Sequence, residues 1–183
     1  EAVLRQALAI DSRHVPAAIN LARVLLAQRR AGETCQLVDN FILTAQAAPA
    51  LLLLRAHALL SMADHSRAIH AFRQAIAAAP NSGPAQIGLA VSLVDDGQHA
   101  AAEEAIRDAI GHGYGEAQSH FVLACALLGQ QRLNEAESEF RTAVHLRADY
   151  LEAHVNLAET LWLRTGNARA VASQIDASLQ LVP

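Results

Sequence analysis

The chain has 183 residues, of which 52% are apolar and only 4% aromatic, and its net charge is −4. This length suits one ordinary domain or an array of several small units. Because much of the apolar content is Ala, the composition favours helices packed closely on small side chains over a β-rich core. No segment approaches the roughly 20 apolar residues that span a bilayer, and no signal peptide is recognisable. We therefore expect no membrane insertion.

The charge is distributed unevenly along the chain. Residues 1–82 hold eight Arg and five acidic residues, a net charge of +3, whereas residues 83–183 hold six Arg and thirteen acidic residues, a net charge of −7. The two ends are expected to have opposite potentials. The sequence has no basic stripe with interleaved aromatic side chains, which is typical of nucleic-acid-binding proteins. We expect no nucleic-acid partner.

Residues 117–150 predict one complete pair of helices. Apolar and small residues recur at helical spacing as far as Leu127, and Gln131 and Arg132 then predict a short turn. A second helical pattern follows and contains Phe140 on its apolar face. Two helices joined by a tight turn pack antiparallel. This stretch is therefore expected to form a helical hairpin.

The spacing within this hairpin is specific. With Ala117 as position 1, Leu123 and Ala124 fall at positions 7 and 8, Ala136 at position 20 and Phe140 at position 24. This pattern resembles the tetratricopeptide repeat family, which has a period of about 34 residues. The resemblance implies an all-α fold, a right-handed solenoid of antiparallel helix pairs. It also implies a role in binding proteins rather than in catalysis.

The same pattern can be followed through nearly the whole chain. We expect one array, in which residues 1–14 are the second helix of a preceding repeat and five repeats follow, at residues 15–48, 49–82, 83–116, 117–150 and 151–183. Beginning inside a repeat is expected of a fragment of a longer protein. The three middle repeats fit without gaps, although Arg55 replaces the usual Leu at position 7.

The first and last repeats depart from the pattern. In residues 15–48 we expect a longer turn, at about residues 29–33, because Phe41 comes three residues after the position of the family's aromatic residue. In residues 151–183, Gly166 comes one residue late, which predicts an insertion in the first helix or its turn. With that shift, Leu181 and Pro183 match the end of the pattern.

No catalytic constellation is recognisable. Residues 111–115 are rich in Gly but lack the preceding strand and the Lys of a phosphate-binding loop, so they predict a turn. Cys35 and Cys125 have no metal-binding or redox spacing and are expected to be ordinary buried thiols. This region is therefore not expected to be an enzyme.

The nine His residues do not indicate a metal site. His120 and His154 both fall at position 4, and His65 and His99 both fall at position 17. Their recurrence follows from the repeat, and none of these pairs has the spacing of metal ligands on one helix. We expect neither a metal nor another cofactor.

The resemblance implies that the first helix of each repeat lines a concave groove, through positions 2, 5, 9 and 12 with positions 6 and 13 beside them. The residues expected to line this partner-binding groove are Ile19, Asn20, Arg23, Leu53, His57, Ile87, Val91, Phe121, Val122, Cys125, Val155, Asn156, Glu159 and Trp162. The middle of this set is almost entirely apolar, and its ends are polar. Such a strip predicts a protein or peptide partner, either an amphipathic helix or an extended segment.

Other interpretations of the strip and of the whole chain stay open. The apolar residues could instead serve self-association, be filled by another segment of the same protein, or simply pack against neighbouring helices. The chain could be a substrate-recruiting or regulatory region of a larger bacterial enzyme, of glycosyltransferase or oxygenase type, or an assembly factor in the envelope or in secretion. Its use of Arg without Lys, together with abundant Ala, is typical of GC-rich bacterial genomes. We expect a cytoplasmic location, or a periplasmic one if the parent protein carries a signal peptide.

Overall fold

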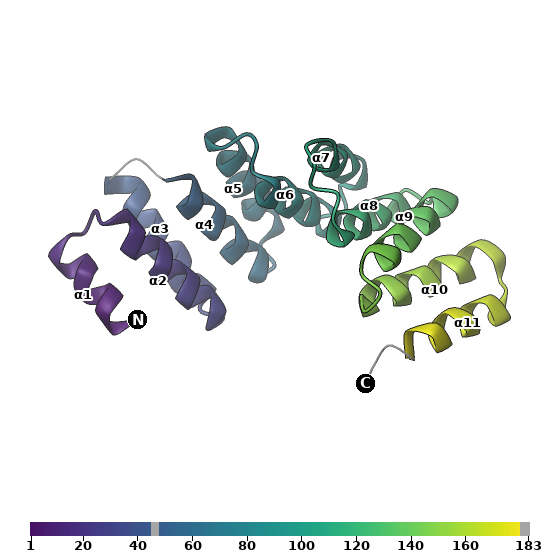
Figure 1. The fold of residues 1–183 in the computed structure, drawn as a ribbon. Helices are drawn as coiled ribbons and strands as arrows, with labels where there is room; N and C mark the ends of the chain where they lie inside the picture. Colours follow the sequence, from purple (N-terminus) through teal and green to yellow (C-terminus); the bar gives the residue numbers. More distant parts are fainter. Residues whose placement is uncertain (45–47, 180–183) are drawn as a thin grey trace. The chain divides into compact units, whose positions relative to one another are not determined.

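The computed structural model describes residues 1–44 and 48–179, and all the regular structure in these ranges is helical (Figure 1). The all-α prediction is therefore confirmed. The helices are α1 (Ala2–Ile10), α2 (Val15–Ala27), α3 (Ala31–Thr44), α4 (Pro49–Ser61), α5 (His65–Ala78), α6 (Gly83–Asp95), α7 (His99–Gly111), α8 (Ala117–Gly129), α9 (Leu133–Leu146), α10 (Leu151–Thr165) and α11 (Ala168–Leu179).

The helices form two compact units. The first unit is Glu1–Ser92 and the second is Leu93–Pro183, so that the boundary falls inside α6. Within each unit, consecutive helices run back and forth as hairpins (Figure 1). Helices α2, α4, α6, α8 and α10 begin at the residues where the sequence pattern starts each repeat.

Each of the first four hairpins turns through three residues, at 28–30, 62–64, 96–98 and 130–132. The middle residue of each turn has a positive φ, and these residues are Arg29, Ala63, Gly97 and Gln131. The next backbone N–H then donates to a carbonyl five residues earlier, as Arg30 does to Leu25 at 2.8 Å. This bond satisfies a carbonyl that the end of the helix leaves without an intrahelical partner. The residue in the left-handed conformation thus lets the chain reverse its direction between the two helices.

Small residues occupy the positions where the two helices of a hairpin come closest. Ala56 and Ala68 in the first unit, and Ala124 and Ala136 in the second, are completely buried. Position 24 is instead filled by a large side chain, and Phe72 and Phe140 have no exposed surface. The alternation of small and large buried residues is what lets antiparallel helices pack at native density. This is the periodicity that identified the repeat in the sequence.

The expected longer turn in residues 15–48 is wrong. Helix α2 ends at Ala27 and α3 begins at Ala31, which leaves the same three-residue turn as in the other hairpins. Position 24 is filled by Val38, which is completely buried. Phe41, which is 5% exposed, packs in the same cluster one turn later in the helix. An aliphatic residue has replaced the aromatic one without changing the register.

The insertion in residues 151–183 is confirmed. Helix α10 has 15 residues, whereas α8 has 13, and Gly166, which follows its last residue, is in the left-handed conformation. Thr165 and Asn167 continue the turn into α11, where the Asn167 side chain accepts from the Arg169 backbone N–H at 3.0 Å. Leu181 and Pro183, which were matched to the end of the pattern, lie outside the described residues.

Candidate protein-interaction surfaces

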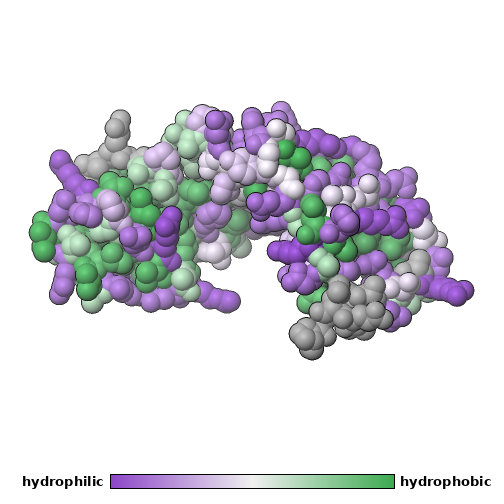
Figure 2. Space-filling model, in the orientation of Figure 1, coloured by the Kyte–Doolittle hydropathy of each residue, from purple (hydrophilic) through white to green (hydrophobic). Residues whose placement is uncertain are grey.

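The first-helix face of the first unit is partly engaged in packing. Ile19 lies half-buried against the cluster that contains Val38 and Phe41, and Leu53 packs against a second cluster around Phe72. Polar and apolar side chains are interleaved on the surface of α1 and α2 (Figure 2). Asn20 and Arg23, in contrast, are exposed. The residues of α2 that a partner can reach are therefore mostly polar.

His57 is fixed against the core. Its ring meets Phe72 edge-on, with centroids 5.1 Å apart, and burial lowers the pKa of the imidazole. The Phe72 ring is also covered by α6, where a Cβ placed on Gly88 would overlap it. Ile87 and Val91, on either side of Gly88, are half-buried. In this part of the first unit, the predicted groove residues pack on the core and leave little surface free.

The aromatic residue of the predicted groove in α8 belongs to a cluster. The ring centroid of Phe121 lies 5.7 Å from that of Phe140 and 5.0 Å from that of Tyr150. The guanidinium carbon of Arg147 sits 3.5 Å from the centre of the Tyr150 ring, which is a cation–π contact. Tyr150 thus covers Phe121 and is itself covered by Arg147.

The neighbouring groove positions in α8 are also enclosed. Val122 is only 5% exposed. Burial raises the pKa of the Cys125 thiol to about 12, and burial also raises the pKa of the Cys35 thiol. Both thiols are unpaired and stay protonated near neutral pH. Neither cysteine has the low pKa that nucleophilic or metal-binding chemistry needs.

Helix α10 presents the most open part of the predicted set. Val155 is 63% exposed and Trp162 is 51% exposed, and Glu159 lies exposed between them. Asn156 is half-buried and donates its side-chain N–H to the Glu152 carbonyl at 2.8 Å. Position 5 and position 12 of this helix therefore carry large apolar side chains in contact with solvent.

A second kind of feature, which the sequence analysis did not identify, is a cluster of ion pairs between successive hairpins. In the second unit, the carboxylate of Glu103 on α7 accepts hydrogen bonds from Arg132 Nη1 at 2.6 Å and from Arg107 Nε at 2.9 Å. Gln130 also donates to Glu103 at 2.8 Å, and Arg132 makes a further contact with Glu135 at 2.6 Å. Two Glu and two Arg thus balance one another across the junction.

The Glu103 side chain is only 15% exposed. Burial raises the pKa of this carboxyl, but the hydrogen bonds from Gln130 and Arg107 and the charge of Arg132 outweigh burial, so that its pKa is lowered overall. The carboxylate therefore stays ionised in the folded protein. A buried charge of this kind is tolerated because it is paired and hydrogen-bonded.

The first unit contains the same arrangement at the same spacing. The carboxylate of Glu1 forms ion pairs with Arg30 at 2.9 Å and with Arg5 at 3.0 Å, and Arg30 also pairs with Glu33 at 2.6 Å. Gln28 accepts from Arg30 at 2.9 Å. In both clusters the first Glu and the central Arg are 29 residues apart. A search of the sequence for charges at the repeat period would have found this pattern, which the search for apolar residues missed.

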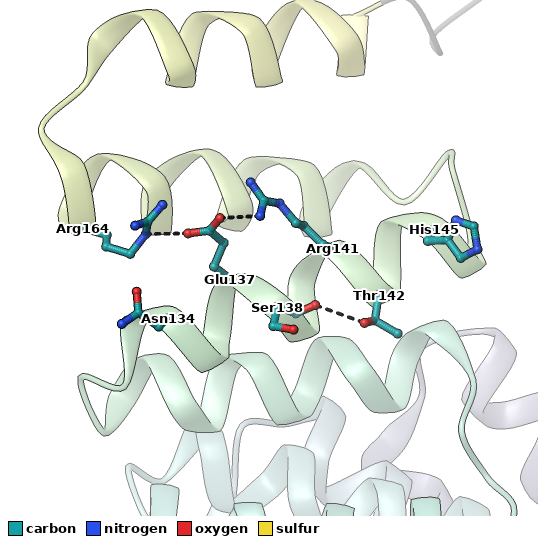
Figure 3. Close-up of a pocket in the computed structure, with 7 residues that line it drawn as sticks. All are labelled: Asn134, Glu137, Ser138, Arg141, Thr142, His145 and Arg164. Atoms are coloured by element: carbon teal, nitrogen blue, oxygen red, sulfur yellow. Dashed lines mark hydrogen bonds and ion pairs between the residues drawn. The ribbon is translucent and has the colours of Figure 1, made fainter.

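A third carboxylate at the equivalent position, Glu137 of α9, is paired differently. Arg141 contacts it at 2.7 Å and Arg164 of α10 at 2.5 Å, and the Glu137 side chain is only 7% exposed. The two guanidinium groups approach the carboxylate from opposite sides (Figure 3). They border an open pocket of about 480 Å³, which is also lined by Asn134, Ser138, Thr142 and His145.

Arg55 also departs from the expectation for position 7. Its Nε donates to Asp39 of α3 at 2.6 Å, and its side chain is 17% exposed. The charged head is thus held by the preceding hairpin. An ion pair replaces the apolar contact that the family pattern has at this position.

The two His residues at position 4 have local structural partners. His120 Nδ1 lies 2.7 Å from Glu139, while His154 Nε2 donates to the Ala148 carbonyl at 2.8 Å. Within residues 1–44 and 48–179, no three His, Cys, Asp or Glu side chains are grouped as metal ligands would be. The helices of these same ranges include none with both the length and the apolar character needed to cross a bilayer.

Comparisons with known proteins define the class to which this fold belongs. A family model described as "Tetratricopeptide repeat" matches residues 53–118 and 121–183, which is more than half of the chain. The chain therefore belongs to the tetratricopeptide repeat family. This fold is one that proteins use as a scaffold for protein–protein interactions. No curated protein sequence matches the chain significantly.

Solved structures share the fold at low sequence identity. MamA from Desulfovibrio magneticus RS-1 has a TM-score of 0.79 at 18% identity, covering 90% of this chain and 92% of that one. YrrB, described as a tetratricopeptide repeat protein with an unusual peptide-binding site, has a TM-score of 0.75 at 17% identity, covering 98% and 92%. TTC0263 from Thermus thermophilus has a TM-score of 0.73 at 19% identity, covering 91% and 90%. At these identities the likeness concerns the fold alone.

Proposed function

We propose that this chain is a non-catalytic scaffold that binds a peptide or helix of another protein on the exposed face of its first helices. The observation that carries the proposal is the exposure of Val155 and Trp162 on α10. Large apolar side chains exposed on one helix face are typical of interaction sites, and Trp is enriched among residues that dominate binding energy. We also propose that the chain consists of a half-repeat followed by five repeats, with the bounds that the sequence pattern predicts.

Two further observations support a protein partner. Membership of the tetratricopeptide repeat family places the chain among scaffolds, and YrrB, which has a similar fold, is described as having a peptide-binding site. The pKa of both Cys thiols is raised by burial, so neither is suited to nucleophilic catalysis. The scaffold interpretation needs no chemistry beyond apolar and polar contacts with the partner.

The exposure of each groove residue separates contact residues from supporting ones. In the second unit, we propose that Val155, Glu159 and Trp162 on α10 contact a partner directly because they are exposed. In the first unit, the exposed candidates for such contacts are Asn20 and Arg23 on α2. The half-buried and buried members hold the helices in place and offer at most an edge to a ligand, and these are Ile19, Leu53, His57, Ile87, Val91, Phe121, Val122, Cys125 and Asn156.

A library of displayed peptides, selected against the chain, would test the proposal. We expect Val155→Asp to weaken binding of the selected peptides by about tenfold or more, because a charge then replaces an exposed apolar side chain that is proposed to contact them. Leu146→Asp, on α9, is the matched control, since Leu146 is 51% exposed but lies on a second helix. Binding by the Val155 variant as tight as by the parent chain would place the site away from the first helices. A loss with the Leu146 variant as large as with the Val155 variant would lead to the same conclusion.

A further inference from the structure

The pocket beside Glu137 lies on the second-helix side of the second unit. What we infer from it does not depend on the function proposed above. Its lining includes Arg141 from α9 and Arg164 from α10, which both contact Glu137. The remaining lining residues, Asn134, Ser138, Thr142 and His145, are all polar. The pocket is therefore built around one carboxylate and two guanidinium groups.

The two balanced clusters differ from this pocket at more than one position. Gly166 stands where they have Arg30 and Arg132, and Arg164 stands where they have Gln28 and Gln130. In the Glu103 cluster, Arg132 has a second carboxylate, Glu135, at 2.6 Å, and in the Glu1 cluster Arg30 has Glu33 at 2.6 Å. Each of these second carboxylates comes 32 positions after the first Glu in the chain, judged by residue number. The same step from Glu137 arrives at Arg169, and the one-residue insertion in the last repeat would bring Ala170 there instead. No carboxylate is available at that point of the repeat.

The charge at the pocket is consequently unbalanced. Among residues 1–44 and 48–179, the two arginines contact one carboxylate, whereas each balanced cluster contains two of each. A guanidinium has five N–H donors, and one carboxylate cannot accept from all ten. The side chain of Arg141 is 63% exposed and that of Arg164 is 36% exposed, so both can be reached by a ligand. The surplus positive charge lies in the half of the sequence with a net charge of −7.

We propose that this pocket binds a carboxylate of a protein segment, as a second acceptor for Arg141 and Arg164 beside Glu137. Arg141 and Arg164 would donate to the incoming carboxylate while they continue to hold Glu137. Planar guanidinium groups match the geometry of a carboxylate and form strong charge-assisted hydrogen bonds with it. At about 480 Å³, the pocket has room for an acidic side chain or the terminal residue of a chain. Asn134, Ser138 and Thr142 add polar groups at its edge.

The direct test follows the Nε–H signals of the arginines by NMR during titrations at constant ionic strength. The probe for an acidic side chain is N-acetylglutamate α-amide, the probe for a chain terminus is N-acetylalanine, and N-acetylglutamine amide is the neutral control. We expect saturable shifts of the Arg141 and Arg164 signals with either or both carboxylates, and none with the neutral control. The probe that binds more tightly then identifies the kind of carboxylate. The signals of Arg107 and Arg132 should not follow the same curve, because their cluster is already balanced.

Two variants separate binding from folding. Arg141→Gln should lower the affinity for the carboxylate probe by about tenfold or more, given the strength of hydrogen bonds between charged groups. Arg107→Gln should leave that affinity unchanged. Asn134→Asp, which keeps both arginines, should also abolish binding because it supplies a carboxylate from within the pocket. Circular dichroism would confirm that each variant is as helical as the parent chain.

Three results would overturn the proposal. The first is an absence of saturation with both carboxylates, and the second is an equal response of Arg107 and Arg132, which would reflect a general charge effect. The third is inorganic phosphate binding at least tenfold more tightly than either carboxylate, which would make the pocket a phosphate site.

Discussion

Two junctions between successive hairpins are held by different physical means. In the first unit, the ring of Phe72 fits against Gly88 of α6, at a place where any Cβ would overlap the ring. In the second unit, Glu103 of α7 forms ion pairs with Arg107 and Arg132 and accepts a hydrogen bond from Gln130. One repeat geometry can thus be stabilised by a ring filling a gap or by a balanced set of charges. The second depends on an ionised carboxylate and should weaken as that carboxylate is protonated.

The largest effect is expected at the apolar junction. Gly88→Ala should lower the free energy of unfolding by about 2–3 kcal/mol, because the added methyl group overlaps the completely buried ring of Phe72. Urea unfolding followed by circular dichroism would measure the change.

Gly32→Ala is the matched control for that substitution. Gly32 lies in α3, and its added Cβ would meet no heavy atom within 4 Å. The control should raise stability by about 0.5 kcal/mol, because Ala is the better helix former. If both alanine variants changed stability equally, close contact with Phe72 would not be the reason for Gly at residue 88.

The ionic junction should give a smaller effect that depends on pH. We expect Glu103→Gln to lower the free energy of unfolding by about 1–2 kcal/mol at pH 7, as for other hydrogen bonds to charged groups. The folded pKa of Glu103 is lowered from the usual value of 4.5. Its contribution is therefore fully present above that value and is lost as the pH falls through the lower, folded pKa.

Urea unfolding of Glu103→Gln and the parent chain at several pH values would measure this contribution. The difference in stability between the two should shrink steadily below pH 4.5. A difference that stayed constant from pH 7 to well below 4 would show that the carboxylate charge is not what stabilises this junction.

The turns of the hairpins should give the smallest effect. Ala63 and Gly97 occupy equivalent turns, with φ of 56° and 76°. Gly suits this left-handed conformation, so Ala63→Gly should raise stability by about 0.5–1 kcal/mol, while Gly97→Ala should lower it by a similar amount. Thermal unfolding of the two variants would show shifts of opposite sign. Shifts of the same sign would contradict the view that these turns are equivalent.

The apolar periodicity of the sequence was sufficient to predict the helices and their family. It failed at Phe41, because an aromatic residue was expected at position 24, where the aliphatic Val38 fills the core instead. Helical periodicity specifies which face of a helix is apolar, but the size of the side chain that fills a gap depends on the neighbouring helix. A residue buried one turn later was thus mistaken for a sign of a longer turn.

The candidate surfaces were harder to predict. Position within the repeat does not determine exposure, since Phe121 is covered by Tyr150, whereas Val155 at the same position of the next repeat is 63% exposed. That difference arises from contacts between residues distant in the repeat pattern. The pairing of Glu137 with Arg164 likewise depends on where α10 ends, after its extra length. Such features need the packed structure.

The fluorescence of Trp162 offers the most direct test of the proposed interaction face. This is the only Trp in the chain, and it is 51% exposed on α10. Titration with a peptide selected for binding should move its emission to shorter wavelength and saturate with the binding curve, because a bound partner would exclude water from the indole ring. A peptide that binds tightly but leaves the emission of Trp162 unchanged would place the interaction elsewhere and contradict the account.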